Sequence, residues 1–387
     1  MTRYTLPAIL ACLTTAALVA ASAQAKPAGP TGSRASGLQR DLQALIAAGA
    51  PGAILFVRDG NRITHLTAGL GDIARKTPMR PDNHFKIASL TKTYTATIVL
   101  QLVGEGTLGL EDTVEQRLPG VVPNGRRITI RQLLNHTSGL VDFENDPRYL
   151  KPYLSGNFGY HWAPRQLVRL AVSHKPLFRP GTRWSYSNTN YVVAQLILEK
   201  VTGHTIGAEL KRRIFQPLRL RNTSYPTTSG LPSPYAHGYR NFGKPPLVDV
   251  TGLSPSLAPG SGAIVSIVRD VAEFYGALLA GRLLEPKELR AMKTVVSERT
   301  GKVVSSGPGY GLGIARSGVA RPSVAVNVSC AGWGHSGELA GYDVSTAFSE
   351  DGRRQAVLMI NQDASTLPNP ARALYGRLID KAFCAGA

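Results

Sequence analysis

The alternation of apolar and polar residues predicts strands near both ends of the chain and helices between them. Short β-branched runs at 52–57 and 62–68 are separated by Arg58-Asp59-Gly60-Asn61, a sequence typical of a hairpin turn. Apolar runs near the other end predict three more strands, at 311–316, 342–348 and 355–360. Helical apolar spacing predicts helices over 38–48, 91–105, 131–135, 164–173, 189–202, 206–214, 270–280 and 370–383.

Because strands at both ends flank a helical middle, the simplest fold is an α/β domain built from both termini with a helical domain inserted. We expect residues 38–85 and 256–387 to form the α/β domain and residues 86–255 to form the mainly helical one. A functional site is expected between the two. Residues 26–37 are small and rich in Pro and Gly, which predicts a flexible leader.

The first 25 residues have the pattern of a cleavable secretory signal peptide. They contain no acid and a single base, Arg3, followed by an apolar run over 6–21 and the small-residue sequence Ala23-Gln24-Ala25. We therefore expect cleavage after Ala25 and a secreted, extracellular protein. An uncleaved anchor helix is the alternative, but the short run and the small residues after it favour cleavage.

Composition places the chain among globular proteins and makes it strongly basic. Of 387 residues, 43% are hydrophobic and 18% are charged, with 44 Lys and Arg against 25 Asp and Glu, for a formal net charge of +19. No basic cluster interleaved with aromatic residues accompanies this charge, so we expect no nucleic-acid partner. Outside a cell the charge permits diffuse binding to anionic wall polymers. We expect a monomer.

Two of the three cysteines, Cys330 and Cys384, remain after removal of the signal peptide. Because the compartment is oxidising, we expect them to form a disulfide; two unpaired thiols are the alternative. The histidines form no i, i+3 or i, i+4 ligand pair, so we expect no metal site. The glycine-rich segment 307–313 does not match a dinucleotide-binding loop, and no cofactor is expected.

Ser89 and Lys92 have the spacing of a nucleophile and its base. Ser89 stands where the segment 85–88 turns into a predicted helix, and Lys92 follows three residues later. Residues i and i+3 share a helix face, so the amine can reach the hydroxyl. A serine needs such a base to attack an acyl carbon, and a lysine can serve when burial and a helix N-terminus lower its pKa. Alone, the pattern is a weak indication because it recurs by chance.

Two further groups of polar residues could complete a site. Tyr186 and Asn188 place a phenol and an amide two residues apart, on a loop that opens a predicted helix. His335, Ser336 and Gly337 place a titratable ring beside glycines ahead of a predicted strand. Glycine there permits the close approach of a ligand or of another backbone segment.

In this order, Ser-x-x-Lys, Tyr-x-Asn and His-Ser-Gly resemble the three signatures of the serine penicillin-recognising enzymes. Segment 133–139 resembles the LLxHxSG stretch of that group, and segment 260–266 resembles its glycine-rich approach to a helix. From about residue 38 to Cys384 the chain is similar to exocellular D-alanyl-D-alanine carboxypeptidases of the class C β-lactamase-like group. The resemblance implies the β-lactamase/DD-peptidase fold, an α/β fold in which helices flank an antiparallel sheet and an all-helical domain is inserted.

The resemblance also implies roles for individual residues. Ser89 would be acylated, and Lys92 would take its proton or hold the network that does. Tyr186 would pass a proton to the leaving amine and later activate water or an acceptor amine. His335 would replace the usual Lys of the third signature, as it does in this carboxypeptidase group. The oxyanion hole would use the N–H groups of Ser89 and Glu338. The residues that would bind the substrate are Asn188, His335, Ser336, Gly337, Glu338 and Arg316.

The chain departs from the carboxypeptidase pattern at two positions. Glu338 stands where those enzymes carry a small hydroxyl residue that helps to hold the terminal carboxylate, and a carboxylate facing a carboxylate is unfavourable. The basic residue expected after the Gly-Leu-Gly strand falls on Ala315, with Arg316 one position further on. Both departures concern the substrate class and leave the reaction class unchanged.

The expected function is that of a secreted serine D-alanyl-D-alanine carboxypeptidase. It would cleave or transfer the terminal D-Ala of peptidoglycan-type peptides through an acyl-enzyme and would bind β-lactams. A β-lactamase, an esterase or a D-aminopeptidase on the same scaffold is the alternative. A non-catalytic wall-binding or sensor module is more remote, because sequence drift in such a module usually removes one of Ser89, Lys92 and Tyr186.

Overall fold

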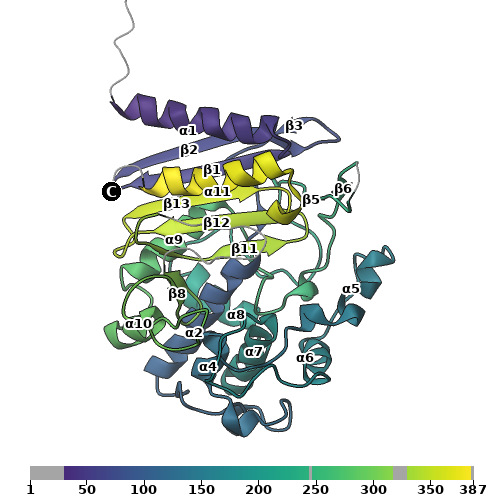
Figure 1. Ribbon diagram of the computed structural model, residues 1–387, viewed down its shortest axis with the longest axis vertical. Coiled ribbons are helices and arrows are strands. Elements are labelled where there is room, and N and C mark those ends of the chain that lie inside the picture. The colour runs from purple at the N-terminus through teal and green to yellow at the C-terminus, as the bar shows by residue number, and fades with distance from the viewer. Residues whose placement is uncertain (1–29, 244–245, 317–328, 385–387) are drawn as a thin grey trace, which may run out of the picture.

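The computed structural model describes residues 30–243, 246–316 and 329–384. The predicted signal peptide and its cleavage site lie outside the described residues. Within the described part, no helix combines the length and apolar character needed to span a bilayer. The elements form a sheet with helices on both of its faces and a large helical region below it (Figure 1).

Strands from both ends of the chain form one antiparallel sheet. They are β1 (Gly52–Asp59), β2 (Arg62–Asp72), β3 (Thr77–Pro78), β8 (Gly309–Tyr310), β9 (Ala315–Arg316), β10 (Trp333–Gly334), β11 (Ser336–Leu339), β12 (Tyr342–Phe348) and β13 (Arg354–Ile360). Their order is β3-β2-β1-β13-β12-β10-β9-β8, and β11 pairs with β12. Asp59 on β1 lies opposite both Arg62 on β2 and Arg354 on β13. The predicted hairpin is confirmed, and it joins the C-terminal strands directly.

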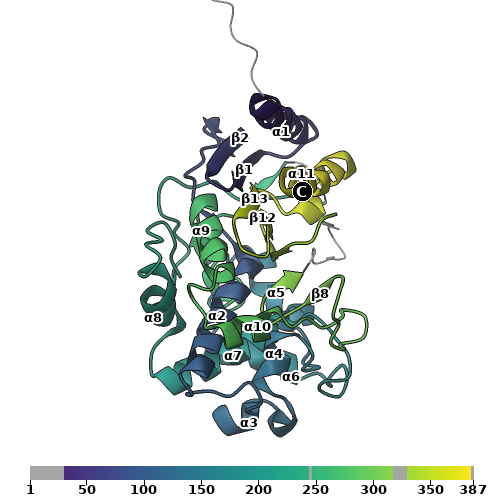
Figure 2. The same ribbon diagram turned by 90° about the vertical axis from the view of Figure 1, so that its left-hand side faces the viewer.

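Strand β1 is buried on both faces, which explains its continuous apolar sequence. Ala53, Leu55 and Val57 pack with α1 (Pro30–Ala47) and α11 (Asn369–Cys384). Ile54 and Phe56 belong to the larger core on the opposite face, as the two-residue period of a strand requires. Figure 2 shows α11 on one side of the sheet and α9 (Val268–Leu279) on the other.

The helical region packs below the sheet around α2 (Thr91–Gly104), which is buried along most of its length. The other helices of this region are α3 (Val114–Arg117), α4 (Ile130–Leu134), α5 (Pro147–Leu154), α6 (Pro164–Val172), α7 (Asn188–Thr202), α8 (Ile206–Leu210), the π-helical turn Lys211–Phe215, and α10 (Pro286–Lys293). The structure confirms the predicted fold class. The inserted segment also carries a short strand pair, β5 (Tyr239–Arg240) with β6 (Val248–Asp249).

The predicted leader over 26–37 is wrong for most of its length, because α1 begins at Pro30. Proline suits the first turn of a helix, where its missing N–H has no partner to lose. Further along α1, the Arg34 guanidinium donates to the carbonyl oxygen of Ala382 at 2.8 Å, which ties the helix to α11.

The predicted strand over 311–316 is confirmed only for its last two residues, which form β9, because residues 311–314 make a turn between β8 and β9. The Gly311 N–H donates to the Ile314 carbonyl at 2.7 Å and closes the turn. Gly313 has a φ of +80° and lies against α2, where a Cβ would stand 2.5 Å from the Cβ of Ala96. The two glycines therefore permit a tight turn at a place where the apolar pattern predicts a strand.

Candidate active site

Ser89 lies on a tight turn between a short strand and a buried helix. Strand β4 (Phe85–Lys86), which pairs with β7 (Val265–Ser266), leads into the 3₁₀ turn Ala88–Leu90 and then into α2. Ala88 has a φ of +48°, an uncommon conformation for a residue with a side chain. Gly337 of β11 approaches this turn so closely that a Cβ would lie 2.4 Å from the Ile87 carbonyl oxygen. Strand β11 therefore runs beside the nucleophile.

Lys92 is fully buried one helical turn after Ser89, and its side-chain nitrogen contacts three oxygens. Nζ lies 3.0 Å from Ser89 Oγ, 2.6 Å from Asn188 Oδ1 and 2.9 Å from the Ser261 carbonyl oxygen. The last two contacts orient the amine toward the serine hydroxyl. The structure thus brings the predicted nucleophile and its predicted base within hydrogen-bonding distance.

Asn188 is held in turn by Asp142, a buried carboxylate. Asp142 Oδ2 accepts hydrogen bonds from the Asn188 backbone N–H at 3.1 Å and from its side-chain amide at 3.0 Å. Burial raises the pKa of Asp142. These bonds turn the amide oxygen of Asn188 toward Lys92, so Asn188 positions the base. Its bond to the substrate, implied by the resemblance, stays a prediction.

Tyr186 stands beside Lys92, whose Nζ lies 4.9 Å from the centre of the phenol ring. The ring of His136 packs against Tyr186 at 4.4 Å between centroids. His136 Nδ1 accepts a hydrogen bond from the Ser187 backbone N–H at 3.2 Å, which fixes the loop that carries Tyr186. Burial, together with the charges of Lys92 and His335, lowers the pKa of His136 well below its usual value, so its ring is neutral.

His335 connects β10 to β11 and is almost completely buried. Its Nε2 lies 2.9 Å from the Tyr310 hydroxyl, and its Nδ1 lies 2.5 Å from the Ser336 carbonyl oxygen. Thr346 Oγ1 accepts from the His335 backbone N–H and donates to its carbonyl, at 3.0 and 2.7 Å. The ring is thus held in one orientation, next to the strand that passes the nucleophile. The roles of His335, Ser336 and Gly337 toward a substrate stay predictions.

A cavity of about 450 Å³ includes the residue that follows Gly337 on β11. Three carboxylates line this acidic cavity, those of Glu338, Glu144 and Asp363. Of the described residues that line it, Arg240 is the one cation, and its guanidinium lies 2.7 Å from Asp363. The rest of the wall is mostly apolar and aromatic, including Tyr149, Tyr153, Phe158, Phe242, Leu253 and Leu257.

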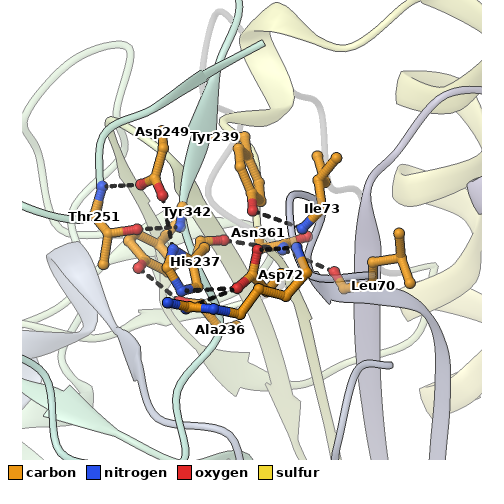
Figure 3. A network of polar contacts seen from close by, with 12 residues as sticks. Leu70, Asp72, Ile73, Ala236, His237, Tyr239, Asp249, Thr251, Tyr342 and Asn361 are labelled. Atoms are coloured by element: carbon orange, nitrogen blue, oxygen red, sulfur yellow. Dashed lines mark hydrogen bonds and ion pairs between the residues drawn. The ribbon is translucent and has the colours of Figure 1, made fainter. Parts of the chain in front are cut away.

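The part of the wall that carries Arg240 is fastened to the sheet by a polar network (Figure 3). His237 Nδ1 lies 2.7 Å from Asp249 Oδ2, which ties the two sides of the β5–β6 segment together. The Asn361 side-chain amide donates to the carbonyl oxygens of Leu70 and His237, at 3.1 and 2.9 Å. These bonds link the wall to β2 and to the end of β13.

Two more predicted features have defined places. The Arg316 guanidinium donates to the carbonyl oxygens of Gly307 and Ser305, at 2.7 and 3.2 Å, so it holds the loop before β8. Its role at the substrate stays a prediction. Cys330 and Cys384 form the predicted disulfide, with 5.7 Å between their Cα atoms, and tie α11 to the chain just before β10.

The sequence alone indicates no role for Asp142 or Tyr310. Asp142 caps a 3₁₀ turn, where its side chain accepts from the Glu144 N–H at 3.2 Å, and this capping pattern is the available signal. Tyr310 lies among the glycines of 307–313, and nothing in its sequence context points to His335. No group of three or more potential metal ligands occurs within the described residues.

The arrangement fits nucleophilic acyl transfer. Lys92 can take the hydroxyl proton as Ser89 Oγ attacks a carbonyl carbon. Tyr186, beside Lys92, can pass a proton to the leaving group as its bond to carbon breaks. The predicted oxyanion donors are the N–H groups of Ser89 and Glu338. Attack by water on the resulting ester would then free the enzyme.

Comparison with known proteins agrees with this chemistry. A family model described as Beta-lactamase matches residues 38–381. The crystal structure of a D-stereospecific amidohydrolase from Streptomyces sp. is 37% identical, with a TM-score of 0.78 over 91% of this chain and 99% of that one. The D-amino acid amidase from Ochrobactrum anthropi SV3, complexed with D-phenylalanine, is 27% identical, with a TM-score of 0.77 over 90% and 98% of the two chains.

A relative that binds penicillin is found as well. Penicillin-binding protein 4* of Bacillus subtilis (strain 168) is 28% identical over 329 residues, which are 81% of this chain and 69% of that protein. The Ser89–Lys92 pair, the fold and these matches lead to one conclusion. The chain belongs to the beta-lactamase family and is a serine hydrolase of the penicillin-recognising group.

Proposed function

We propose that the protein is a serine amidohydrolase that releases an N-terminal D-amino acid from an amide or a short peptide. Acylation of Ser89 by the D-aminoacyl group would expel the amine, and water would then release the free D-amino acid. This is the D-aminopeptidase alternative considered above. The observation that carries the proposal is the excess of carboxylates in the acidic cavity.

The acidic cavity fits a substrate with a free ammonium group. Glu338 follows Gly337 on the strand beside the nucleophile, and Glu144 and Asp363 share the same cavity. An ammonium 4 Å from a carboxylate is attracted by about 1 kcal/mol in water and by about 4 kcal/mol at an effective dielectric of 20. A terminal carboxylate in the same place would be repelled by similar amounts.

The apolar wall fits a substrate side chain larger than a methyl group. A volume of about 450 Å³ with several aromatic residues exceeds what alanine would fill. The D configuration is supported by the two structural neighbours, which are described as a D-stereospecific amidohydrolase and a D-amino acid amidase.

A D-alanyl-D-alanine carboxypeptidase is the second candidate. It is supported by the likeness to Penicillin-binding protein 4* and by the presence of His335 in the third signature. Its substrates would be peptidoglycan-type peptides, with β-lactams as acylating analogues. Secretion, which rests on the sequence of residues 1–25, belongs to both candidates.

The test compares three substrates. We expect kcat/KM for D-phenylalanine amide to exceed that for its N-acetyl derivative by at least about tenfold, because acetylation removes the ammonium charge. Glu338→Gln should reduce this ratio, and Glu111→Gln, an exposed glutamate outside the acidic cavity, should leave it unchanged. Faster cleavage of an N-acylated peptide ending in D-Ala-D-Ala would contradict the proposal and favour the carboxypeptidase.

A further inference from the structure

A second cavity, of about 580 Å³, has the opposite charge and a different place in the fold. It opens at α8 and the π-helical turn Lys211–Phe215, and it shares no lining residue with the acidic cavity. Lys211, Arg219 and Arg221 line it, and no carboxylate of the described chain does. We propose that this basic cavity binds a phosphate group carried on an organic body.

Among the described residues, these three cations lack the ion pairs that neutralise the neighbouring arginines. Arg212 and Arg213, on the same turn as Lys211, pair with Glu209 at 2.8 and 2.5 Å. Lys211, Arg219 and Arg221 are exposed, and within the described chain none of the three forms an ion pair. Their charges therefore add up over the cavity instead of cancelling.

Two carboxylates lie close to the lining residues but do not themselves line the cavity. Asp270 accepts hydrogen bonds from the Asn222 N–H and the Thr223 hydroxyl, at 2.9 and 3.0 Å. Glu199 accepts from the Ile206 N–H at 3.0 Å. Both carboxylates are thus directed at backbone N–H groups, and neither lines the cavity.

The floor of the basic cavity is preformed and apolar. Phe215, Leu220 and the ring of Tyr225 line it. The Tyr225 hydroxyl accepts from the Gly260 N–H at 2.9 Å, and Ser224 exchanges two backbone hydrogen bonds with Val265, at 2.9 and 3.0 Å. A wall held in this way needs little ordering when a ligand binds, and its apolar surface favours a ligand with a carbon body.

Phosphate is the anion that best matches the three cations of the basic cavity. A phosphate group presents three acceptor oxygens, and guanidinium groups bind such oxygens in a bidentate manner. Two arginines and a lysine can together match a doubly charged phosphate monoester. The same chemistry occurs in a soluble or wall-borne phosphate ester and in an anionic lipid headgroup, and the experiment separates these sources.

Phenyl phosphate is the probe, because it joins a phosphate to a flat apolar ring. Binding to the full mature chain is measured by calorimetry at low and at physiological salt. We expect the double variant Arg219→Gln/Arg221→Gln to weaken binding at least about tenfold. Arg212→Gln removes the same kind of charge nearby but outside the cavity, and it should change the affinity less than about twofold. Inorganic phosphate should bind several-fold more weakly than the probe.

The outcomes decide the proposal and the source of the ligand. Equal affinity of the double variant and the wild type, or equal loss in Arg212→Gln, overturns the site, because binding would then follow overall charge. Equal affinity for inorganic and phenyl phosphate overturns the role of the apolar floor. Vesicles of phosphatidylglycerol that bind with the same ranking of variants identify a lipid headgroup. Binding of the probe without such vesicle binding identifies a soluble or wall-borne phosphate ester.

Discussion

Two buried lysines flank the nucleophile, Lys86 three residues before Ser89 and Lys92 three residues after it. Lys92 Nζ contacts the Ser89 hydroxyl, whereas Lys86 Nζ donates to the carbonyl oxygens of Thr251 and Leu253, at 2.9 and 2.7 Å. Both lysines are buried, but their hydrogen-bond partners differ. A buried lysine becomes a candidate base when its partner is a group that can react.

The surroundings of Lys86 indicate a structural task. Its two carbonyl partners belong to the segment that also supplies Leu253 and Leu257 to the acidic cavity. Lys86 therefore holds the cavity wall against β4, next to the turn of Ser89. Burial lowers the pKa of Lys86 to about 7, against the opposing effect of Asp249.

The difference between Lys92 and Lys86 matters only if Ser89 is the residue that is acylated. Ser89→Ala should abolish acylation, with a loss of about 10⁴-fold or more in kcat, because it removes the hydroxyl that Lys92 contacts. The variant should melt at the wild-type temperature, since the change removes one oxygen atom. Turnover at a comparable rate would mean that another residue carries the reaction.

Replacing each lysine by methionine tests the comparison itself. Lys92→Met should lower kcat by about 10² to 10⁴-fold, as expected for loss of a general base. Lys86→Met should keep kcat within about tenfold of the wild type and act mainly on KM through the cavity wall. If the two variants lost kcat equally, the difference in partners would have no functional meaning.

The pH dependence of kcat/KM tests the role of His335, which lies on the strand side of the site. If the His335 ring contributes to binding or acylation, replacing it by an amine should move one limb of the pH profile of kcat/KM. His335→Lys should move that limb upward in pH, with roughly a tenfold change in rate at pH 7. An identical profile in the variant would remove His335 from the mechanism.

The last of these predictions concerns stability and not rate. The pKa of Lys86 is about 7 when folded, below its ordinary value of 10.5, so between these values the unfolded chain binds more protons. The unfolding free energy of the wild type should therefore rise with pH in that window, by up to about 1.4 kcal/mol per pH unit. Urea midpoints should show this rise relative to Lys86→Met but not relative to Lys287→Met, whose lysine is exposed. Parallel curves for all three proteins would show that Lys86 does not carry the effect.

The apolar pattern correctly predicts the helices and strands whose conformation is set by their own residues. The β1–β2 hairpin follows from its turn residues, and α2 and α7 follow from long apolar repeats. The apolar pattern predicts a strand at 311–314, whereas the chain turns there with Gly313 packed against α2, a contact that no local pattern records. At such positions the backbone conformation is set by tertiary contacts, which the sequence pattern does not show.

The site likewise contains residues that local spacing brings together and residues that only the fold brings together. Ser89 and Lys92 meet because they share one helix turn, so their spacing suffices. Lys86 has the same spacing on the other side, and the sequence Lys-x-x-Ser-x-x-Lys does not say which lysine points at the hydroxyl. Asp142 reaches Asn188 across 46 positions of the chain, and the acidic cavity joins still more distant segments. Such long-range contacts cannot be predicted from one sequence.

The most direct test of the proposed reaction is mass spectrometry of the quenched enzyme during turnover of D-phenylalanine methyl ester. We expect a D-phenylalanyl group, with its amine free, on the peptide that contains Ser89. We expect no such adduct with the L enantiomer or in Ser89→Ala. An adduct on another residue, or equal labelling by both enantiomers, would contradict the proposed reaction.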